Sequence, residues 1–124
     1  MNTSTLVVVE SPFAGDVSTN IKYARACVMD CLKRGEFPFA SHLLYTQTGV
    51  LRDNVPSERE LGIIAGLAWG ERADKTVVYI DLGVTRGMEF GINAARQVKR
   101  PIEYRTLNGD VLYRIIGKAT PISF

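Results

Sequence analysis

Short β-branched segments alternate with helical patterns along this chain, and this alternation constrains its fold more than any other feature. Residues 5–10 and 76–81 have the composition of buried parallel strands. Residues 37–44 are expected to form another strand, with Pro38 near its start because proline cannot donate to a central ladder.

Helical periodicity separates these strands. We expect helices over about residues 20–34, from Ser57 to near Arg72, and over about residues 88–99. Strands separated by helices pair in parallel through right-handed crossovers. The pattern therefore predicts an α/β fold, a three-layer sandwich with a mainly parallel, Rossmann-like or flavodoxin-like sheet.

The end of the chain has a different pattern. Residues 102–107 and 110–116 flank Asn108-Gly109, a pair that favours a two-residue hairpin turn because both positions tolerate positive φ. We therefore expect a C-terminal antiparallel hairpin. A length of 124 residues is that of one domain, so a single domain over residues 1–124 is expected.

Composition excludes several classes of function. The 15 Lys and Arg against 13 Asp and Glu leave a net charge of +2, too little for a concentrated nucleic-acid-binding surface. Without an apolar run of membrane-spanning length or an export signal, we expect a cytoplasmic protein with no membrane partner. A single histidine, and Cys27 and Cys31 one helical turn apart, predict no metal site, no cofactor and reduced, buried thiols.

Polar residues follow each predicted parallel strand. Ligands of open parallel sheets bind outside the carboxyl ends of the strands, where loops meet helix amino ends. We therefore expect one binding site at this edge. The residues that the three strands deliver there are Ser11, Phe13, Asp16, Ser41, His42, Asp81, Thr85, Arg86, Gly87 and Glu89.

The loop after the strand at residues 76–81 is the most informative. Gly83 and Gly87 let the backbone approach a ligand, while Thr85, Arg86 and the first helical amides can hold an anion. Glu89 lies in the first helical turn, where the helix dipole keeps it ionised and suited to attack an electrophilic sugar carbon. On spacing alone, the favoured interpretation is a glutamate that only complements the dipole and glycines that only shape a loop.

The run Gly87-Met88-Glu89-Phe90-Gly91 resembles the Gly-Met-Glu-hydrophobic-Gly element of nucleoside 2-deoxyribosyltransferases, and more loosely that of deoxynucleoside-monophosphate N-glycosidases. The similarity covers about residues 5–105 and is greatest to small phage and bacterial members of this superfamily. It implies that Glu89 attacks C1′ and expels the base. By its position at the end of the preceding strand, Asp81 is expected to be a second catalytic group. The substrate-binding residues that position and resemblance together indicate are Ser11, Phe13, Asp16, Asn20, Arg25, His42, Gly83, Thr85, Arg86, Gly87 and Met88.

The chain departs from the resembled enzymes on its second long helix. They carry an aspartate there, six to eight residues before the aspartate that precedes the next strand, whereas this chain has Gly66 and Ala68 in that interval before Asp74. Departure of a base needs a proton or a hydrogen bond on the leaving nitrogen, so an active enzyme must recruit another acid. The candidates by position are Asp81, Asp16 and His42.

Several candidates have a structural alternative. Asp16 and Asn20 could shape the loop and cap the first helix. Arg25 could bind phosphate or an acidic side chain, and His42 could be a structural residue. Phe13 and Tyr45 could stack on a base, or they could pack in the core.

Two hypotheses about function follow. The first is a nucleoside- or nucleotide-binding protein that cleaves or exchanges an N-glycosidic bond through Glu89, as a hydrolase or a deoxyribosyltransferase. The second is a non-catalytic binder that sequesters a nucleotide or a nucleotide-derived signal in the same pocket. In both, the partner is a small molecule and the protein is expected to form a homodimer or a higher homo-oligomer.

Overall fold

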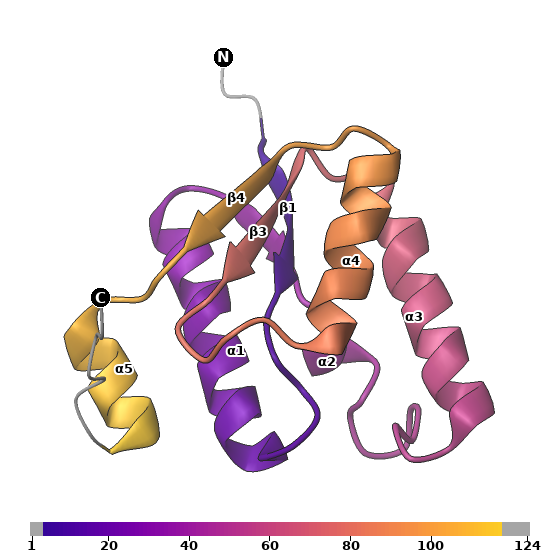
Figure 1. Cartoon of the computed structure of the whole chain (residues 1–124), viewed down its shortest axis with the longest axis horizontal. Coiled ribbons are helices and arrows are strands. Elements are labelled where there is room, and N and C mark those ends of the chain that lie inside the picture. The colour runs from indigo at the N-terminus through magenta and orange to yellow at the C-terminus, as the bar shows by residue number, and fades with distance from the viewer. Residues whose placement is uncertain (1–3, 118–124) are drawn as a thin grey trace.

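Four parallel strands form one sheet in the order β2-β1-β3-β4. The computed structural model describes residues 4–117. Its strands are β1 (Leu6–Glu10), β2 (Phe37–Phe39), β3 (Lys75–Tyr79) and β4 (Ile102–Arg105), and each neighbouring pair is parallel. The predicted α/β class with a mainly parallel sheet is therefore confirmed (Figure 1).

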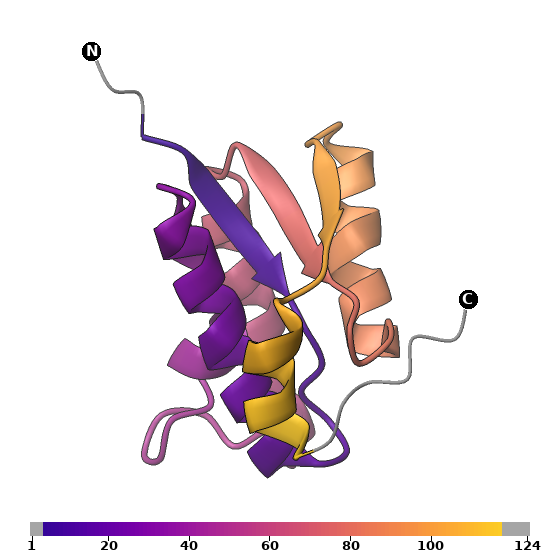
Figure 2. The ribbon, with the colours of Figure 1, turned by 90° about the vertical axis from the view of Figure 1, so that its left-hand side faces the viewer.

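Helices cover both faces of this sheet, which makes three layers (Figure 2). One face carries α1 (Val17–Lys33) and α5 (Gly109–Ile116). The opposite face carries α3 (Pro56–Gly70) and α4 (Arg86–Gln97), and the short helix α2 (Ser41–Leu44) packs against α1 and α3. None of the helices within residues 4–117 combines the length and the apolar character needed to cross a membrane.

The two faces hold separate cores because successive strand residues point to opposite sides. On the α1 and α5 side the buried strand residues are Val7, Val9, Val77 and Tyr79. On the α4 side Val78 packs with helix residues of the second core. Helix residues complete the two cores, with Tyr23, Cys27, Cys31 and Leu112 on the first side and Met88 and Ile92 on the second, and Leu107 from the segment before α5 joins the first. Both cysteines are buried, free thiols, as the sequence predicted.

The strand order creates a switch point between β1 and β3. From β1 the chain crosses one face through α1 to β2, and it returns over the other face through α3 to β3. The loops that leave the carboxyl ends of β1 and β3 therefore diverge to opposite sides of the sheet. In open α/β sheets such a crevice is where ligands bind.

The predicted C-terminal hairpin is wrong. β4 pairs in parallel with β3, and residues 109–116 form helix α5 instead of a returning strand. The side chain of Asn108 accepts a hydrogen bond from the amide of Asp110 and caps that helix, so Asn108-Gly109 is a helix start. Leu112 is buried, with Val111, Ile115 and Ile116 packed around the same core, a spacing that suits a helix.

The second predicted strand is also shorter than expected. Only Phe37–Phe39 pairs with β1, and α2 takes up the residues that follow. Ser41 and His42 therefore reach the sheet edge from a helical turn and not from a strand. The helix after β1 begins earlier than predicted because Asp16 caps it.

Candidate functional site

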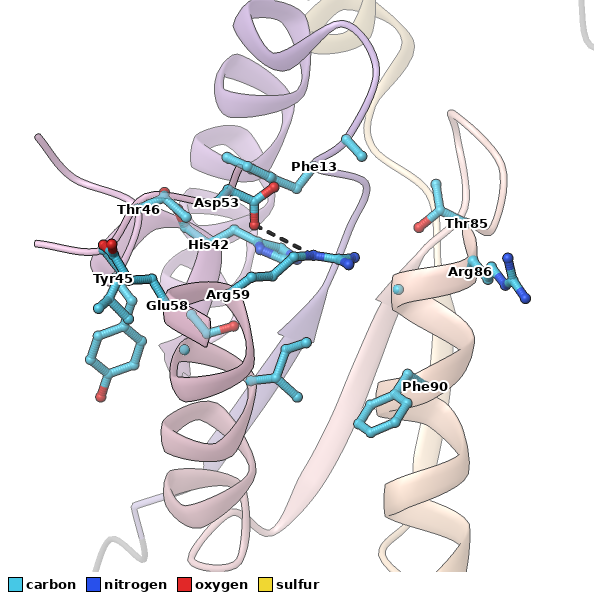
Figure 3. A pocket seen from close by; sticks show the side chains of 16 residues that line it. Phe13, His42, Tyr45, Thr46, Asp53, Glu58, Arg59, Thr85, Arg86 and Phe90 are labelled. Atoms are coloured by element: carbon cyan, nitrogen blue, oxygen red, sulfur yellow. Dashed lines mark hydrogen bonds and ion pairs between the residues drawn. The ribbon is translucent and has the colours of Figure 1, made fainter. Parts of the chain in front are cut away.

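A cavity of about 470 Å³ lies at the carboxyl ends of β1 and β3, at the switch point of the sheet. Figure 3 shows its two walls, with α3 and its preceding loop on one side and α4 on the other. Phe13 and Ala14 enter from the loop after β1. Pockets that bind small molecules have volumes of this order.

One end of the cavity is an aromatic stack. The rings of Phe13 and His42 lie 4.9 Å apart between centroids and 14° from parallel. Burial lowers the pKa of His42, with the opposing pull of nearby Asp53 a smaller effect, so its imidazole is neutral at pH 7. The stack offers a flat apolar surface to the cavity, and Tyr45 lines the wall beside it.

The α3 wall supplies a cation. Arg59 projects from α3 into the cavity, and its Nε lies 3.7 Å from Oδ1 of Asp53 (Figure 3). Its side chain is 56% exposed, so this ion pair is weak and leaves donors for a ligand. The cavity's other carboxylate, Glu58, is bound by Arg52 at 2.7 Å, and these hydrogen bonds lower its pKa.

Two glycines let neighbouring segments approach α3 closely. A Cβ at Gly62 would lie 3.3 Å from Leu51, and one at Gly66 would lie 3.2 Å from Ser41. Both distances are shorter than ordinary contacts, so these glycines allow α2 and the loop at residues 46–55 to form the rear of the cavity. Gly66 lies in the stretch of the helix where the resembled enzymes carry an aspartate. In this chain it has a packing role, because it lets Ser41 approach the helix.

The α4 wall supplies backbone donors. Oγ1 of Thr85 accepts a hydrogen bond from the amide of Met88, which caps the helix. The amides of Arg86 and Gly87 have no hydrogen-bond partner within residues 4–117, and both residues line the cavity. In Figure 3 the guanidinium of Arg86 points away from the stack, whereas the ring of Phe90 points toward the α3 wall.

Glu89 does not line this cavity. It is exposed, and it lies on a different face of α4 from the cavity residues Gly87 and Phe90. Met88 is fully buried against the sheet, and one residue further along a helix is a rotation of about 100°. That rotation turns Glu89 to the exposed side that it shares with Asn93, one helical turn from the cavity residue Arg86.

Asp81 lies on the other face of the sheet. Its carboxylate accepts hydrogen bonds from the hydroxyl of Tyr23 at 2.6 Å and from the amide of Leu107 at 3.0 Å. Both partners belong to the core beneath α1 and α5. Asp81 therefore ties the end of β3 to α1 and to the segment before α5, and it does not line the cavity.

Other predicted residues support the loop after β1. Asp16 caps α1, and the hydrogen bonds from Thr19 lower its pKa. Asn20 donates hydrogen bonds to the carbonyls of Phe13 and Ala14 at 2.9 and 3.0 Å, which fixes the turn that presents Phe13. Ser11 is also buried.

The structure brings seven of the residues named from the sequence as site candidates together at the cavity. The remaining ones lie outside its lining: Arg25 is exposed on α1, and Gly83 turns the loop after β3 with a φ of +89°. The seven candidates that line the cavity are Phe13, Ser41, His42, Tyr45, Thr85, Arg86 and Gly87.

Sequence reasoning missed Arg59, Asp53 and Phe90 as cavity residues. The two glycines on one side of α3 were a usable signal, because small residues inside a helix often mark a close approach. Arg59 lies one turn before Gly62, at the same cavity wall.

Sequence reasoning also missed Glu10, the last residue of β1. Its carboxyl group lies against Gly91 of α4, and no hydrogen bond from it is found within the described part of the chain. Burial raises its pKa to about 8, against an opposing effect of Arg100. A carboxylate ending a buried strand at a binding edge was the available signal.

No group of three or more His, Cys, Asp or Glu side chains among residues 4–117 could hold a metal ion. The donors that the cavity does offer are the guanidinium of Arg59, backbone amides and aromatic faces. Such a set suits a planar, anionic organic ligand better than a metal.

Comparison with known proteins shows which proteins share this fold. The profile of a family described as a domain of unknown function (DUF7768) matches residues 5–105. No curated protein matches the chain. Among solved structures, a 2-deoxyribosyltransferase from Bacillus psychrosaccharolyticus matches with a TM-score of 0.59 and 16% identity, over 85% of this chain and 74% of that one. The chain therefore shares the deoxyribosyltransferase fold.

Proposed function

The chain belongs to the family described as a domain of unknown function (DUF7768), and we propose that it binds a nucleoside or nucleotide in the cavity between α3 and α4. One observation carries this proposal. The Phe13–His42 stack, the Arg59 guanidinium and the amides of Arg86 and Gly87 line the same 470 Å³ space. A flat aromatic surface binds bases of any kind, and a cation beside a helix amino end binds phosphate.

The fold supports the same ligand class. The similar 2-deoxyribosyltransferase is described as a biocatalyst for the synthesis of nucleosides. A cavity at the switch point of that fold is a reasonable place for a nucleoside in this chain too. Cleavage or exchange of an N-glycosidic bond is therefore the reaction we propose if the ligand is turned over.

The position of Glu89 favours binding over attack by this residue. A nucleophile must reach C1′ of a ligand held by the aromatic stack, but the Glu89 carboxylate lies on the exposed side of α4. We therefore rank sequestration of an unaltered ligand above bond cleavage through Glu89. A Glu89→Gln variant that abolished base release would reverse this ranking.

The experiment is a binding and turnover screen. The protein is incubated with nucleosides, 2′-deoxynucleosides and their 5′-monophosphates. Release of free base is measured by chromatography, and affinity is measured by calorimetry. Arg59→Gln should weaken the binding of monophosphates at least tenfold more than the binding of the matching nucleosides, because only the monophosphates carry a phosphate anion. Arg25→Gln, an exposed arginine on α1, is the matched control. If no ligand of this panel binds, the proposed function is wrong.

We also propose that the protein assembles with copies of itself. Helix α3 exposes Leu61, Ile64 and Trp69, each more than half accessible, and the exposed Phe90 of α4 lines a shallow hollow together with Ile64. Exposed apolar side chains grouped in this way are typical of association surfaces. Light scattering at micromolar concentration tests this, and a monomer would contradict it. Ile64→Glu should then dissociate the assembly.

A further inference from the structure

We infer that Glu10, at the carboxyl end of β1, is the carboxyl group that donates to the base of the bound ligand in this chain. The inference rests on the proposed function and identifies a residue of its site. Four observations support it: the face of the sheet on which Glu10 lies, its contact with Gly91, its lack of a hydrogen-bond partner, and the engagement of the other carboxylates nearby.

Glu10 points toward the helices that form the cavity. It shares the strand face of Val8, whose side chain approaches Gly70 of α3. Its carboxyl group rests on Gly91 of α4, where a Cβ would lie 2.5 Å from its Cδ. Glu10 thus lies on the cavity side of the sheet, whereas Asp81 is on the other side.

The contact with Gly91 places the carboxyl group next to the part of α4 that lines the cavity. Gly87, Phe90 and Gly91 are spaced i, i+3 and i+4, so they share one side of the helix. The first two of them line the cavity, whereas Gly91 and Glu10 do not, so the proposal requires the base of the ligand to extend past Phe90 to reach the carboxyl group. A side chain at position 91 would exclude the carboxyl group, so glycine is the residue that lets Glu10 lie against this side of the helix.

The carboxyl group of Glu10 makes no hydrogen bond within residues 4–117, although its surroundings exclude most water. No fully buried side-chain oxygen of the described chain lacks a partner, so the Glu10 oxygens retain some access to solvent. The cation that faces it, Arg100, is itself bound to Thr76 Oγ1 and to the carbonyl of Gly70. The carboxyl group is thus free to meet a ligand.

The other carboxylates near the site are occupied or turned away. Asp53 pairs with Arg59, and Glu58 pairs with Arg52. Glu89 is on the exposed side of α4. With a pKa of about 8, Glu10 carries a proton at neutral pH and can donate it, whereas the paired carboxylates accept only.

This proton supplies what base departure requires. The Glu10 proton moves to a ring nitrogen of the base while the electron pair of the C1′–N bond moves onto the base. A water molecule adds to C1′ and releases its proton to solvent, and Glu10 is reprotonated from solvent. Where the ligand is only bound, the same carboxyl group donates a hydrogen bond to the base.

The test compares Glu10→Gln with Glu89→Gln, using 2′-deoxynucleoside 5′-monophosphates as probes. In the wild-type protein, affinity should fall about tenfold per pH unit above pH 8, where Glu10 loses its proton. Glu10→Gln still donates through its amide, so its affinity should change less than threefold and lose this pH dependence. If base is released, Glu10→Gln should slow release at least about 100-fold, and Glu89→Gln should not.

The outcomes separate the two claims. If the wild-type protein binds none of the probes, the proposed function falls and this inference falls with it. If the probes bind and Glu10→Gln keeps the wild-type pH profile and any base release, the inference alone is wrong. A loss of release in Glu89→Gln with full release in Glu10→Gln would assign the role to Glu89 instead.

Discussion

The carboxyl group of Glu10 occupies the space that a side chain at position 91 would need, so a strand residue and a helix glycine share one site. The two residues belong to β1 and α4, which meet only in the folded protein. This contact is testable without any ligand, because it makes the effect of a substitution at one position depend on the residue at the other.

Gly91→Ala should destabilise the protein by about 1–3 kcal/mol, because the new methyl group overlaps the Glu10 carboxyl group. In a Glu10→Ala background the same substitution should stabilise by about 0.5–1 kcal/mol, since alanine is the better helix former. Urea unfolding of the four proteins measures the coupling. The control is Gly87→Ala, where the nearest atom lies 4.0 Å from the added Cβ. Equal effects of Gly91→Ala in both backgrounds would disprove the contact.

Glu10 should make stability depend on pH between about 4.5 and 8. The carboxyl group has a pKa of about 8 in the folded chain and 4.5 when exposed, so the unfolded state loses its proton first as pH rises. The free energy of unfolding is therefore highest, as far as Glu10 affects it, below pH 4.5. It falls between pH 4.5 and pH 8 by at most about 1.4 kcal/mol per pH unit. Glu10→Gln removes this loss. Its melting temperature should exceed that of the wild type at pH 8.5 and equal it at pH 4, and a constant difference would contradict the prediction.

The buried pair of Glu36 and Arg105 should give the opposite pH dependence. Arg105 donates two hydrogen bonds to Glu36, at 2.8 and 2.6 Å, and lowers the pKa of Glu36 to about 2. This contribution to stability is present above pH 4.5 and lost as pH falls toward 2. Glu36→Gln should cost about 3–5 kcal/mol at pH 7, because it leaves the buried Arg105 guanidinium with only the more exposed Glu103 as a counter-charge.

The matched control for that pair is Glu103→Gln. Glu103 also contacts Arg105, but its side chain is 42% exposed, and its loss should cost about 1 kcal/mol or less. Both variants are compared with the wild type by chemical denaturation at pH 7 and at pH 3. A cost of Glu36→Gln that does not shrink at low pH would show that the pair does not stabilise through charge.

Asp81 should be a stabilising residue and not a cavity residue. Asp81→Ala leaves the amide of Leu107 and the hydroxyl of Tyr23 without their acceptor, which should cost about 1–3 kcal/mol. Nucleotide affinity of the folded variant should be unchanged. Glu71→Ala, at the exposed end of α3, is the control and should change stability by less than about 0.5 kcal/mol. A stable Asp81→Ala protein that had lost affinity or base release would restore the catalytic role expected from sequence.

The layered parallel fold was predictable because it depends on periodicity, but two segments were ambiguous locally. Asn108-Gly109 fits a hairpin turn and a helix start equally well, and only packing on the α1 side selects the helix. Residues 37–44 form a short apolar run, which periodicity cannot assign to strand or helix. The structure divides it between β2 and α2.

The candidate site was predictable to the level of a sheet edge. The rule for parallel sheets brings Phe13, His42 and Thr85 to one cavity, as expected. The rule does not predict on which side of α4 helix α3 lies. The position of α3 decides whether Glu89 or Gly87 lines the cavity. The roles of Arg59 and Glu10 likewise depend on how α3 and α4 approach β1, which is a tertiary property.

Calorimetric titration of 2′-deoxynucleoside 5′-monophosphates into the wild-type protein and its Phe13→Ala variant tests the central claim most directly. Removal of the ring that stacks on His42 should weaken binding by about 1–3 kcal/mol, roughly 5- to 150-fold, while the fold is retained. The account predicts one site per chain in the wild type and this loss in the variant. No binding to the wild type, or equal affinity in the two proteins, would contradict it.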